Sequence, residues 1–265
     1  MKKQVTLGVI GGGFMARALV GGAIKHGFLA AEEIAVGEPS PENAEKMRAL
    51  GVRVTQDDRD VASSCRCLLL CVKPQSLSAV AEDLRGIGIP FVISIMAGVT
   101  RERIASALGC RAVARAMPNL PCAVGEGMTA VAADGLTEER RAFALGLFSA
   151  AGRAMEAEER LLDAVTGVSG SGPAYVYLFL RSLIEAGIAQ GLSREQAETL
   201  AFQTVKGGLK MAESTSSTLS ELIAAVSSKG GTTVAALSSL EKDDFAGAVT
   251  RAVAAAAGRA AELSS

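Results

Sequence analysis

The 265-residue sequence contains no tryptophan, only 4% aromatic residues and a single histidine. This shortage, together with 29 glycines, favours closely packed helices and tight turns over a core of large rings. Neither sign of charge dominates, since 27 Lys and Arg accompany 28 Asp and Glu for a formal net charge of -1. The sequence therefore lacks the bulk field that attracts nucleic acid or an anionic membrane, and we expect neither as a partner.

Cysteine pairs and long apolar runs are also missing. The five cysteines are odd in number and form no C-x-x-C pair, so we expect buried, reduced thiols and no bound metal. Apolar runs such as Cys67–Val72 and Ala174–Leu180 are far shorter than the roughly 18 residues that cross a bilayer. Met1–Leu7 has two lysines but no long signal core, so we expect a cytoplasmic protein.

A change of pattern near residue 158 predicts two domains. Over residues 1–158, short aliphatic runs alternate with helical patterns, which is typical of βα units around a largely parallel, doubly wound sheet. Over residues 159–265 the strand signals vanish. The helical patterns that replace them cover residues 173–190, 193–213, 218–226, 232–241 and 245–263. We predict an α/β fold with an N-terminal Rossmann-like dinucleotide-binding domain followed by an all-helical domain.

The segment Gly8–Ala16 is the most informative local feature. It reads as the end of a strand, a G-x-G-x-x-A turn and the start of a helix. In this pattern Gly11 permits the tight turn, Gly13 lets the backbone approach a pyrophosphate, and Ala16 allows close packing of helix on strand. The context favours a dinucleotide site over an ordinary glycine turn.

Glu38 lies where such a fingerprint places an acidic residue, just after the second predicted strand. A carboxylate there accepts hydrogen bonds from the ribose hydroxyls and repels a 2′-phosphate, which favours NADH, and Asp58 adds to that bias. Ser40 argues the other way, because its hydroxyl and the nearby amides suit a phosphate. The choice between NADH and NADPH stays open, as does the alternative that Glu38 is only a solvated turn residue.

Three further segments and one single residue have the chemistry of a binding site. The sequence Val72-Lys73-Pro74 and the residue Asn119 follow strands, at the sheet edge where ligands bind in such folds, although Lys73 alone reads equally well as surface charge. In the second domain, the Gly- and Ser-rich segments 163–175 and 227–233 each open a helix. Unpaired backbone amides in segment 227–233 suit a substrate carboxylate. The alternative is that this segment is a purely structural turn.

In this order, these segments resemble those of pyrroline-5-carboxylate reductases, and the resemblance spans nearly the whole chain. The segments that carry it are 11–15, 72–74, 97–100, 115–119, 127–129, 163–175 and 230–233. The resemblance implies reduction of 1-pyrroline-5-carboxylate to L-proline, the last step of proline biosynthesis, by hydride transfer from NADPH or NADH. It also implies a homodimer, or a decamer of five dimers, with the active site between the domains.

The resemblance further implies roles for single residues. In the second domain, Ser228 and the amides of the Gly230–Thr233 turn (Gly230, Gly231, Thr232) hold the substrate carboxylate, and the Thr233 hydroxyl faces the ring nitrogen as the catalytic group. The implied cofactor residues, with Glu38, Asp58 and Asn119 added from the pattern, are Gly11, Gly13, Phe14, Met15, Ser40, Val72, Lys73 and Pro74.

Two departures from the family pattern leave alternatives open. Lys229 replaces the usual proline before the Gly-Gly pair, and Ala224-Ala225 replaces an upstream acidic residue. A non-catalytic nicotinamide-binding sensor is therefore one alternative. A hydroxyacid dehydrogenase of the 6-phosphogluconate type is another, although Lys206 and Lys210 lack the glycine pattern that accompanies its catalytic lysine.

The lone histidine, His26, is expected at the far end of the first helix, in a structural or surface role. A cyclic imine can itself carry the proton that makes its carbon electrophilic. The predicted reaction therefore needs no strong general acid.

Overall fold

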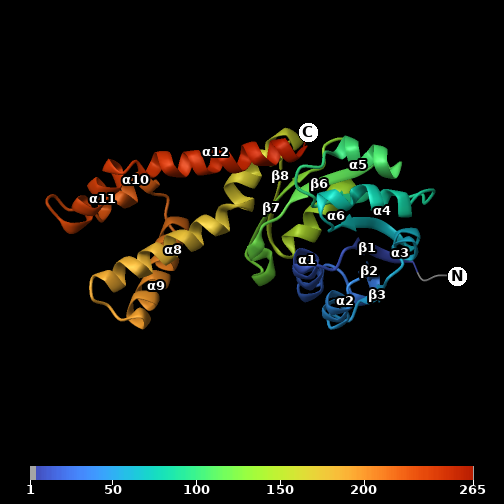
Figure 1. The fold of residues 1–265 in the computed structure, drawn as a ribbon, viewed down its shortest axis with the longest axis horizontal. Helices are drawn as coiled ribbons and strands as arrows, with labels where there is room; N and C mark the ends of the chain where they lie inside the picture. The colour runs from blue at the N-terminus through green and yellow to red at the C-terminus, as the bar shows by residue number, and fades with distance from the viewer. Residues whose placement is uncertain (1–3, 265) are drawn as a thin grey trace. The chain divides into compact units, whose positions relative to one another are not determined.

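The computed structural model describes residues 4–264 in two compact units, residues 4–171 with 254–264, and Gly172–Val253. Met1–Lys3, part of the segment inspected for a signal sequence, lies outside the described residues. The first unit contains an eight-stranded sheet of order β3-β2-β1-β4-β5-β6-β7-β8 (Figure 1). Its strands are β1 Val5–Ile10, β2 Ile34–Gly37, β3 Arg53–Thr55, β4 Cys65–Leu70, β5 Val92–Ser94, β6 Val113–Met117, β7 Gly127–Ala132 and β8 Gly152–Glu156.

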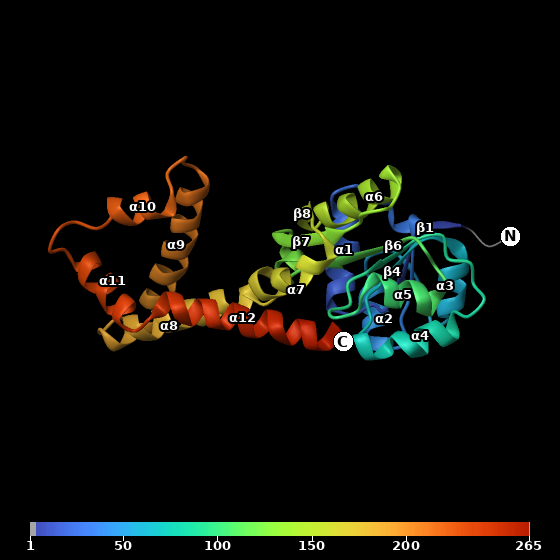
Figure 2. The same ribbon diagram turned by 90° about the horizontal axis from the view of Figure 1, so that it is seen from above.

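All neighbouring strands are parallel except the antiparallel pair β6 and β7. The strand order and right-handed crossovers place α1, α2 and α6 on one face of the sheet and α3, α4 and α5 on the other (Figures 1 and 2). These helices are α1 Phe14–Lys25, α2 Pro41–Arg48, α3 Asp58–Ser64, α4 Leu77–Asp83, α5 Arg101–Leu108 and α6 Glu138–Ser149. The predicted doubly wound fold is confirmed.

Continuous aliphatic sequence builds the central strands, because helices cover them on both faces. Residues 67–70 of β4 and 7–10 of β1 are all buried. The order of strands reverses between these two neighbours, and Ile10 lies opposite Leu70. β1 and β4 therefore end side by side at the carboxyl edge of the sheet. This is the switch point at which such folds bind ligands.

The second unit is helical, as predicted. It holds α8 Gly172–Ala189, α9 Arg194–Glu213, α10 Leu219–Ala225, α11 Thr232–Lys242 and the start of α12 Phe245–Ser264. Capping boxes start two of these helices: Ser193 with Gln196 begins α9, and Thr218 with Glu221 begins α10. No helix within residues 4–264 combines the length and the apolar character needed to cross a membrane.

The compact units divide the chain at a different place from the predicted boundary between residues 158 and 159. The helix α7 Leu162–Val165 stays with the first unit because buried Leu162 packs against Ala130 and Ala132 of β7. The end of α12 also belongs to the first unit. There Gly98 has a φ of +73°, and a Cβ on it would lie 2.7 Å from the Leu263 carbonyl oxygen, so only glycine permits this approach.

Two strands do not coincide with the apolar runs of the sequence. β4 ends at Leu70 instead of Val72, because Cys71 and Val72 turn out of the sheet toward a short 3-10 turn at Pro74–Ser76. β5 covers only Val92–Ser94, although the strand-like sequence pattern extends over Pro90–Ile95. In both cases the apolar sequence continues past the last residue that pairs with a neighbouring strand. Apolar composition alone therefore places the end of the strand too late.

A buried cation joins β6 to the segment that follows the sheet. Arg115 is 5% exposed, and its guanidinium lies 3.6 Å from Glu159 Oε1 and 3.6 Å from Asp163 Oδ1. Glu159 Oε1 also accepts a hydrogen bond from the Arg101 amide at 2.7 Å. Arg115 thus balances two carboxylates that enter the first unit from residues 159–163.

Replacing Arg115 with methionine should lower the free energy of unfolding by about 2 kcal/mol, because two half-buried carboxylates lose their counterion. Urea unfolding followed by circular dichroism at one protein concentration measures this loss. Arg103→Met removes an exposed arginine from α5 and serves as the control. Equal stability of the two variants would show that the Arg115 ion pairs do not stabilise the fold.

Candidate functional site

The glycine turn after β1 is held against the neighbouring strand exit. Gly11 has a φ of +92°, and a Cβ on it would lie 2.8 Å from the Cys71 carbonyl oxygen. Its amide donates to the Gly37 carbonyl at 2.8 Å, and the Cys71 amide donates to the Ile10 carbonyl at 2.9 Å. The turn therefore requires glycine both for its conformation and for its close contact with Cys71.

Gly13 leaves room in front of α1. It is the residue that precedes the helix, it provides no side-chain cap, and a Cβ on it would meet nothing within 4 Å. The first amides of α1 thus open onto free space at the positive end of a 12-residue helix. Phe14 beside them is 49% exposed. This arrangement fits the pyrophosphate of a dinucleotide, as the fingerprint predicted.

Glu38 crosses over the glycine turn and is only 6% exposed. Its Oε2 accepts from the Gly12 amide at 2.6 Å, and its Oε1 accepts from the Ser40 amide at 2.7 Å. This burial rules out the alternative that Glu38 is a solvated turn residue. Ser40 begins α2, and its Oγ accepts from the Asn43 amide at 3.5 Å.

Asp58 lies beside Glu38 at the start of α3. Its Oδ1 occupies the space next to Gly37, where a Cβ would lie 2.0 Å from it. Within residues 4–264, this buried oxygen has no hydrogen-bond partner. Burial, followed by the charges of Asp83, Glu38 and Asp57, raises the pKa of Asp58 from 3.8 to about 6.

Arg17 is a site residue that sequence reasoning missed. Its Nη1 lies 3.3 Å from the Gly12 carbonyl oxygen and 3.1 Å from Asn43 Oδ1, so this cation ties the glycine turn to α2. The signal that could have found it is its place in the first turn of α1, directly after Ala16 of the fingerprint.

The other predicted cofactor residues differ in how they are placed. Val72 lies at the turn, since a Cβ on Gly11 would be 3.1 Å from its Cγ1, and exposed Lys73 leads into the 3-10 turn that starts at Pro74. Asn119 is engaged within the protein. Its Nδ2 donates to Ser169 and its Oδ1 accepts from the Met128 amide at 2.8 Å. The structure gives Asn119 a bracing role, and its cofactor contact stays a prediction.

In the second unit, the predicted substrate residues form the turn before α11. Gly230 has a φ of +73°, and the Gly231 amide donates to the Ser228 carbonyl at 2.9 Å. A Cβ on Gly231 would lie 2.4 Å from Ser228 Oγ, so the hydroxyl is folded over this glycine. Gly231 provides no side-chain cap, which leaves the first amides of α11 available to an anion.

Two threonines follow this turn at the start of α11. Thr232 is exposed and Thr233 is half-buried. Lys229, the departure from the family pattern, is also exposed. The turn thus keeps its hydroxyls and amides, as the sequence predicted, and adds a cation beside them.

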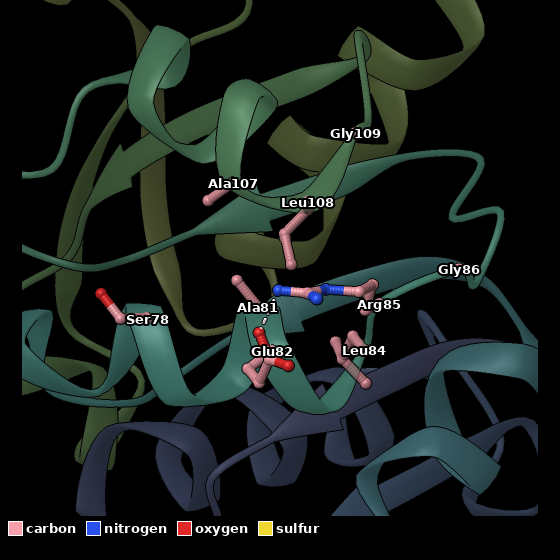
Figure 3. A pocket seen from close by; sticks show the side chains of 9 residues that line it. All are labelled: Ser78, Ala81, Glu82, Leu84, Arg85, Gly86, Ala107, Leu108 and Gly109. Atoms are coloured by element: carbon pink, nitrogen blue, oxygen red, sulfur yellow. Dashed lines mark hydrogen bonds and ion pairs between the residues drawn. The ribbon is translucent and has the colours of Figure 1, made fainter.

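A cavity of about 440 Å³ lies elsewhere in the first unit, between the ends of α4 and α5 (Figure 3). Its lining includes an ion pair between Arg85 and Glu82. These helix ends lead into the amino ends of β5 and β6, whereas the glycine turn lies at the carboxyl edge. The cavity therefore has no part in the dinucleotide site.

Comparison with known proteins identifies the family. Residues 6–98 match the family model "NADP oxidoreductase coenzyme F420-dependent", and residues 159–263 match "Pyrroline-5-carboxylate reductase dimerisation". The pyrroline-5-carboxylate reductase of Synechocystis sp. is 44% identical over 98% of both chains. This chain is a member of the pyrroline-5-carboxylate reductase family. The predicted resemblance is confirmed, and with it an oxidoreductase that uses NADPH or NADH.

Solved structures agree with this membership across both units. A pyrroline carboxylate reductase of Plasmodium falciparum with NADP bound has a TM-score of 0.90 at 30% identity, over 99% of each chain. The pyrroline-5-carboxylate reductase of Coxiella burnetii has a TM-score of 0.88 at 34% identity, over 99% of this chain and 100% of the other. Family membership decides against the hydroxyacid dehydrogenase of the 6-phosphogluconate type.

The raised pKa of Asp58 predicts a pH-dependent cost to folding. Since the folded state binds this proton more tightly than the unfolded state, the free energy of unfolding falls as pH rises from 3.8 to about 6, and this loss remains above that range. Asp58→Asn should therefore raise stability at pH 8 by about 1 kcal/mol, after solvent screening of this half-exposed group, and by less at pH 5.

Urea unfolding at both pH values measures the difference, and Glu45→Gln on the exposed part of α2 is the matched control. A gain that is equal at pH 5 and pH 8 would contradict a titrating Asp58.

Proposed function

We propose that the protein reduces 1-pyrroline-5-carboxylate to L-proline, the last step of proline biosynthesis, with NADPH or NADH as the hydride donor. The observation that carries this proposal is the Ser228–Thr233 turn, with its serine, glycines and threonines in place, in a member of the pyrroline-5-carboxylate reductase family. The open helix start behind Gly13 supports the cofactor half of the reaction.

In this proposal, the first amides of α1 hold the pyrophosphate. Gly11 has no side chain that would keep the pyrophosphate away from the turn. Glu38 receives the ribose hydroxyls of the adenosine half. Val72, Lys73 and Pro74 border the bound cofactor, next to the exits of β1 and β4. When bound, the cofactor supplies the hydride.

The Ser228–Thr233 turn binds the substrate. The Ser228 hydroxyl and the amides of Gly231 and Thr232 donate hydrogen bonds to the carboxylate, because an uncapped helix start favours an anion. The exposed Lys229 ammonium adds attraction for the same charge, in place of the rigid φ that proline would supply.

Thr233 positions the reacting bond. Its hydroxyl oxygen accepts the N–H of the protonated imine and so fixes the ring while hydride adds to the neighbouring carbon. The C=N π electrons become the nitrogen lone pair, and the proton already on nitrogen stays in the product amine. The imine brings its own proton, which explains why the exposed His26 at the end of α1 has no part in the chemistry.

Thr233→Ala should lower kcat on the order of 10- to 100-fold and leave the Kd of the cofactor unchanged, because only orientation of the imine is lost. Loss of absorbance at 340 nm in the presence of pyrroline-5-carboxylate measures kcat, and calorimetry measures Kd. Thr233→Ser keeps the hydroxyl and should retain most activity. If wild type binds the cofactor but never oxidises it, the non-catalytic sensor is the correct function.

The assembled form in this proposal is a homodimer, or a decamer of five dimers, joined through the helical domain. Exposed apolar side chains support this interface, since side chains such as Tyr177 and Leu178 of α8 and Phe202 of α9 are each more than half exposed. The matched dimerisation model covers the same helices.

Sedimentation velocity at micromolar concentration should give a mass of two chains, or of ten, and no monomer, because the apolar faces of α8 and α9 are too large to stay in water. Tyr177→Glu combined with Phe202→Glu should shift the distribution toward the monomer, while Glu45→Gln should not. A wild-type monomer would refute the homo-oligomer.

We also place the activity in the cytoplasm. All five cysteines have free thiols, and four of them are buried. Burial raises the pKa of Cys65 to about 11 and that of Cys67 well above its ordinary value. Unreactive, unpaired thiols suit a reducing compartment.

A further inference from the structure

We infer that this enzyme selects NADH over NADPH through two carboxylates, Glu38 and Asp58, which lie together at the carboxyl end of β2. The inference rests on the proposed function, because it concerns the cofactor of that reaction. It does not follow from family membership, since a relative has been solved with NADP bound.

Glu38 is held in place by the protein backbone. The Gly12 amide donates a hydrogen bond to Glu38 Oε2, and the Ser40 amide donates one to Glu38 Oε1. A carboxylate offers about four acceptor positions, so each oxygen keeps one for another donor. The 2′- and 3′-hydroxyls of an unmodified ribose are such donors. A 2′-phosphate presents charged acceptors in the same place and is repelled.

The backbone amide and the cation nearest to a 2′-phosphate are already engaged. The Ser40 amide donates to Glu38, while the Ser40 hydroxyl accepts from the Asn43 amide as the cap of α2 and keeps its own O–H as a donor. The neighbouring cation, Arg17, is turned toward the Gly12 carbonyl oxygen and Asn43 Oδ1. To bind a phosphate, the Ser40 amide and Arg17 would have to leave their present partners, whereas a diol can donate to Glu38 without displacing them.

Asp58 adds a second negative charge to the same corner. Its Oδ1 is packed against Gly37, the residue before Glu38, and is a buried acceptor without a donor within residues 4–264. The two carboxylates lie close enough for the Glu38 charge to act on the Asp58 titration. A ligand with hydroxyl donors relieves this excess of acceptors, and a ligand with a phosphate increases it.

Calorimetric titration of NADH and NADPH at pH 8, where Asp58 is ionised, tests the selection. The wild-type Kd for NADPH should exceed that for NADH by roughly tenfold or more. Glu38→Gln and Asp58→Asn should each reduce the ratio of the two Kd values about threefold, and the double variant should bring it near one. Glu45→Gln removes an exposed charge from α2 and should leave the ratio unchanged.

Thermal melting of each variant identifies any that fail to fold. Asp58→Asn removes no hydrogen bond within residues 4–264 at its buried oxygen and keeps the test decisive if Glu38→Gln unfolds the glycine turn. Wild-type protein that binds NADPH as tightly as NADH, or a double variant with the wild-type ratio, would overturn the selection.

Turnover with the imine separates this result from the proposed function. Equal reduction of pyrroline-5-carboxylate with both cofactors would refute the NADH selection and support the proposed function. Selective binding of NADH without reduction of the imine would refute the proposed function and support the selection.

Discussion

The contact between Gly11 and the Cys71 carbonyl oxygen is the constraint on which the cofactor half of the site depends. Because β1 and β4 are parallel neighbours with Ile10 opposite Leu70, their chains leave the sheet together and must turn in different directions. A side chain on Gly11 would force the exits apart. The close turn directs α1 across the edge with its amides open, and it presents the Gly12 amide to Glu38.

Local signals predicted the elements of this fold because they act over a few residues. Ser193 with Gln196 fixes a helix start through contacts within one turn, and the spacing of Gly11, Gly13 and Ala16 fixes the turn after β1. The end of β4 was misplaced because Cys71 and Val72 are as apolar as the strand, and only pairing distinguishes them. Leu162 was assigned across the boundary because its partners in β7 are distant in sequence.

The candidate site could be predicted in its residues but not in their partners. The sequence placed Glu38 near a ribose, yet its burial depends on a hydrogen bond to Gly12, 26 residues away. Asn119 was assigned to the sheet edge, where it lies, but Ser169 and Met128 occupy its amide group. The position of a residue along a strand can be inferred from a sequence pattern. Its hydrogen-bond partners cannot, because they depend on which distant residues the tertiary structure places next to its side chain.

The inferred selection assigns the raised pKa of Asp58 to cofactor recognition and not to the chemical step. Shifted pKa values usually point to an acid or base that exchanges a proton with the substrate. In the proposed reaction the imine arrives with its proton, so hydroxyl and amide groups at Ser228 and Thr233 would suffice to hold it. The burial that raises the pKa of Asp58 instead reflects an acceptor-rich corner beside Gly37. Unpaired buried acceptors are costly until hydroxyl donors reach them, and in the inferred selection this cost distinguishes a ribose diol from a phosphate.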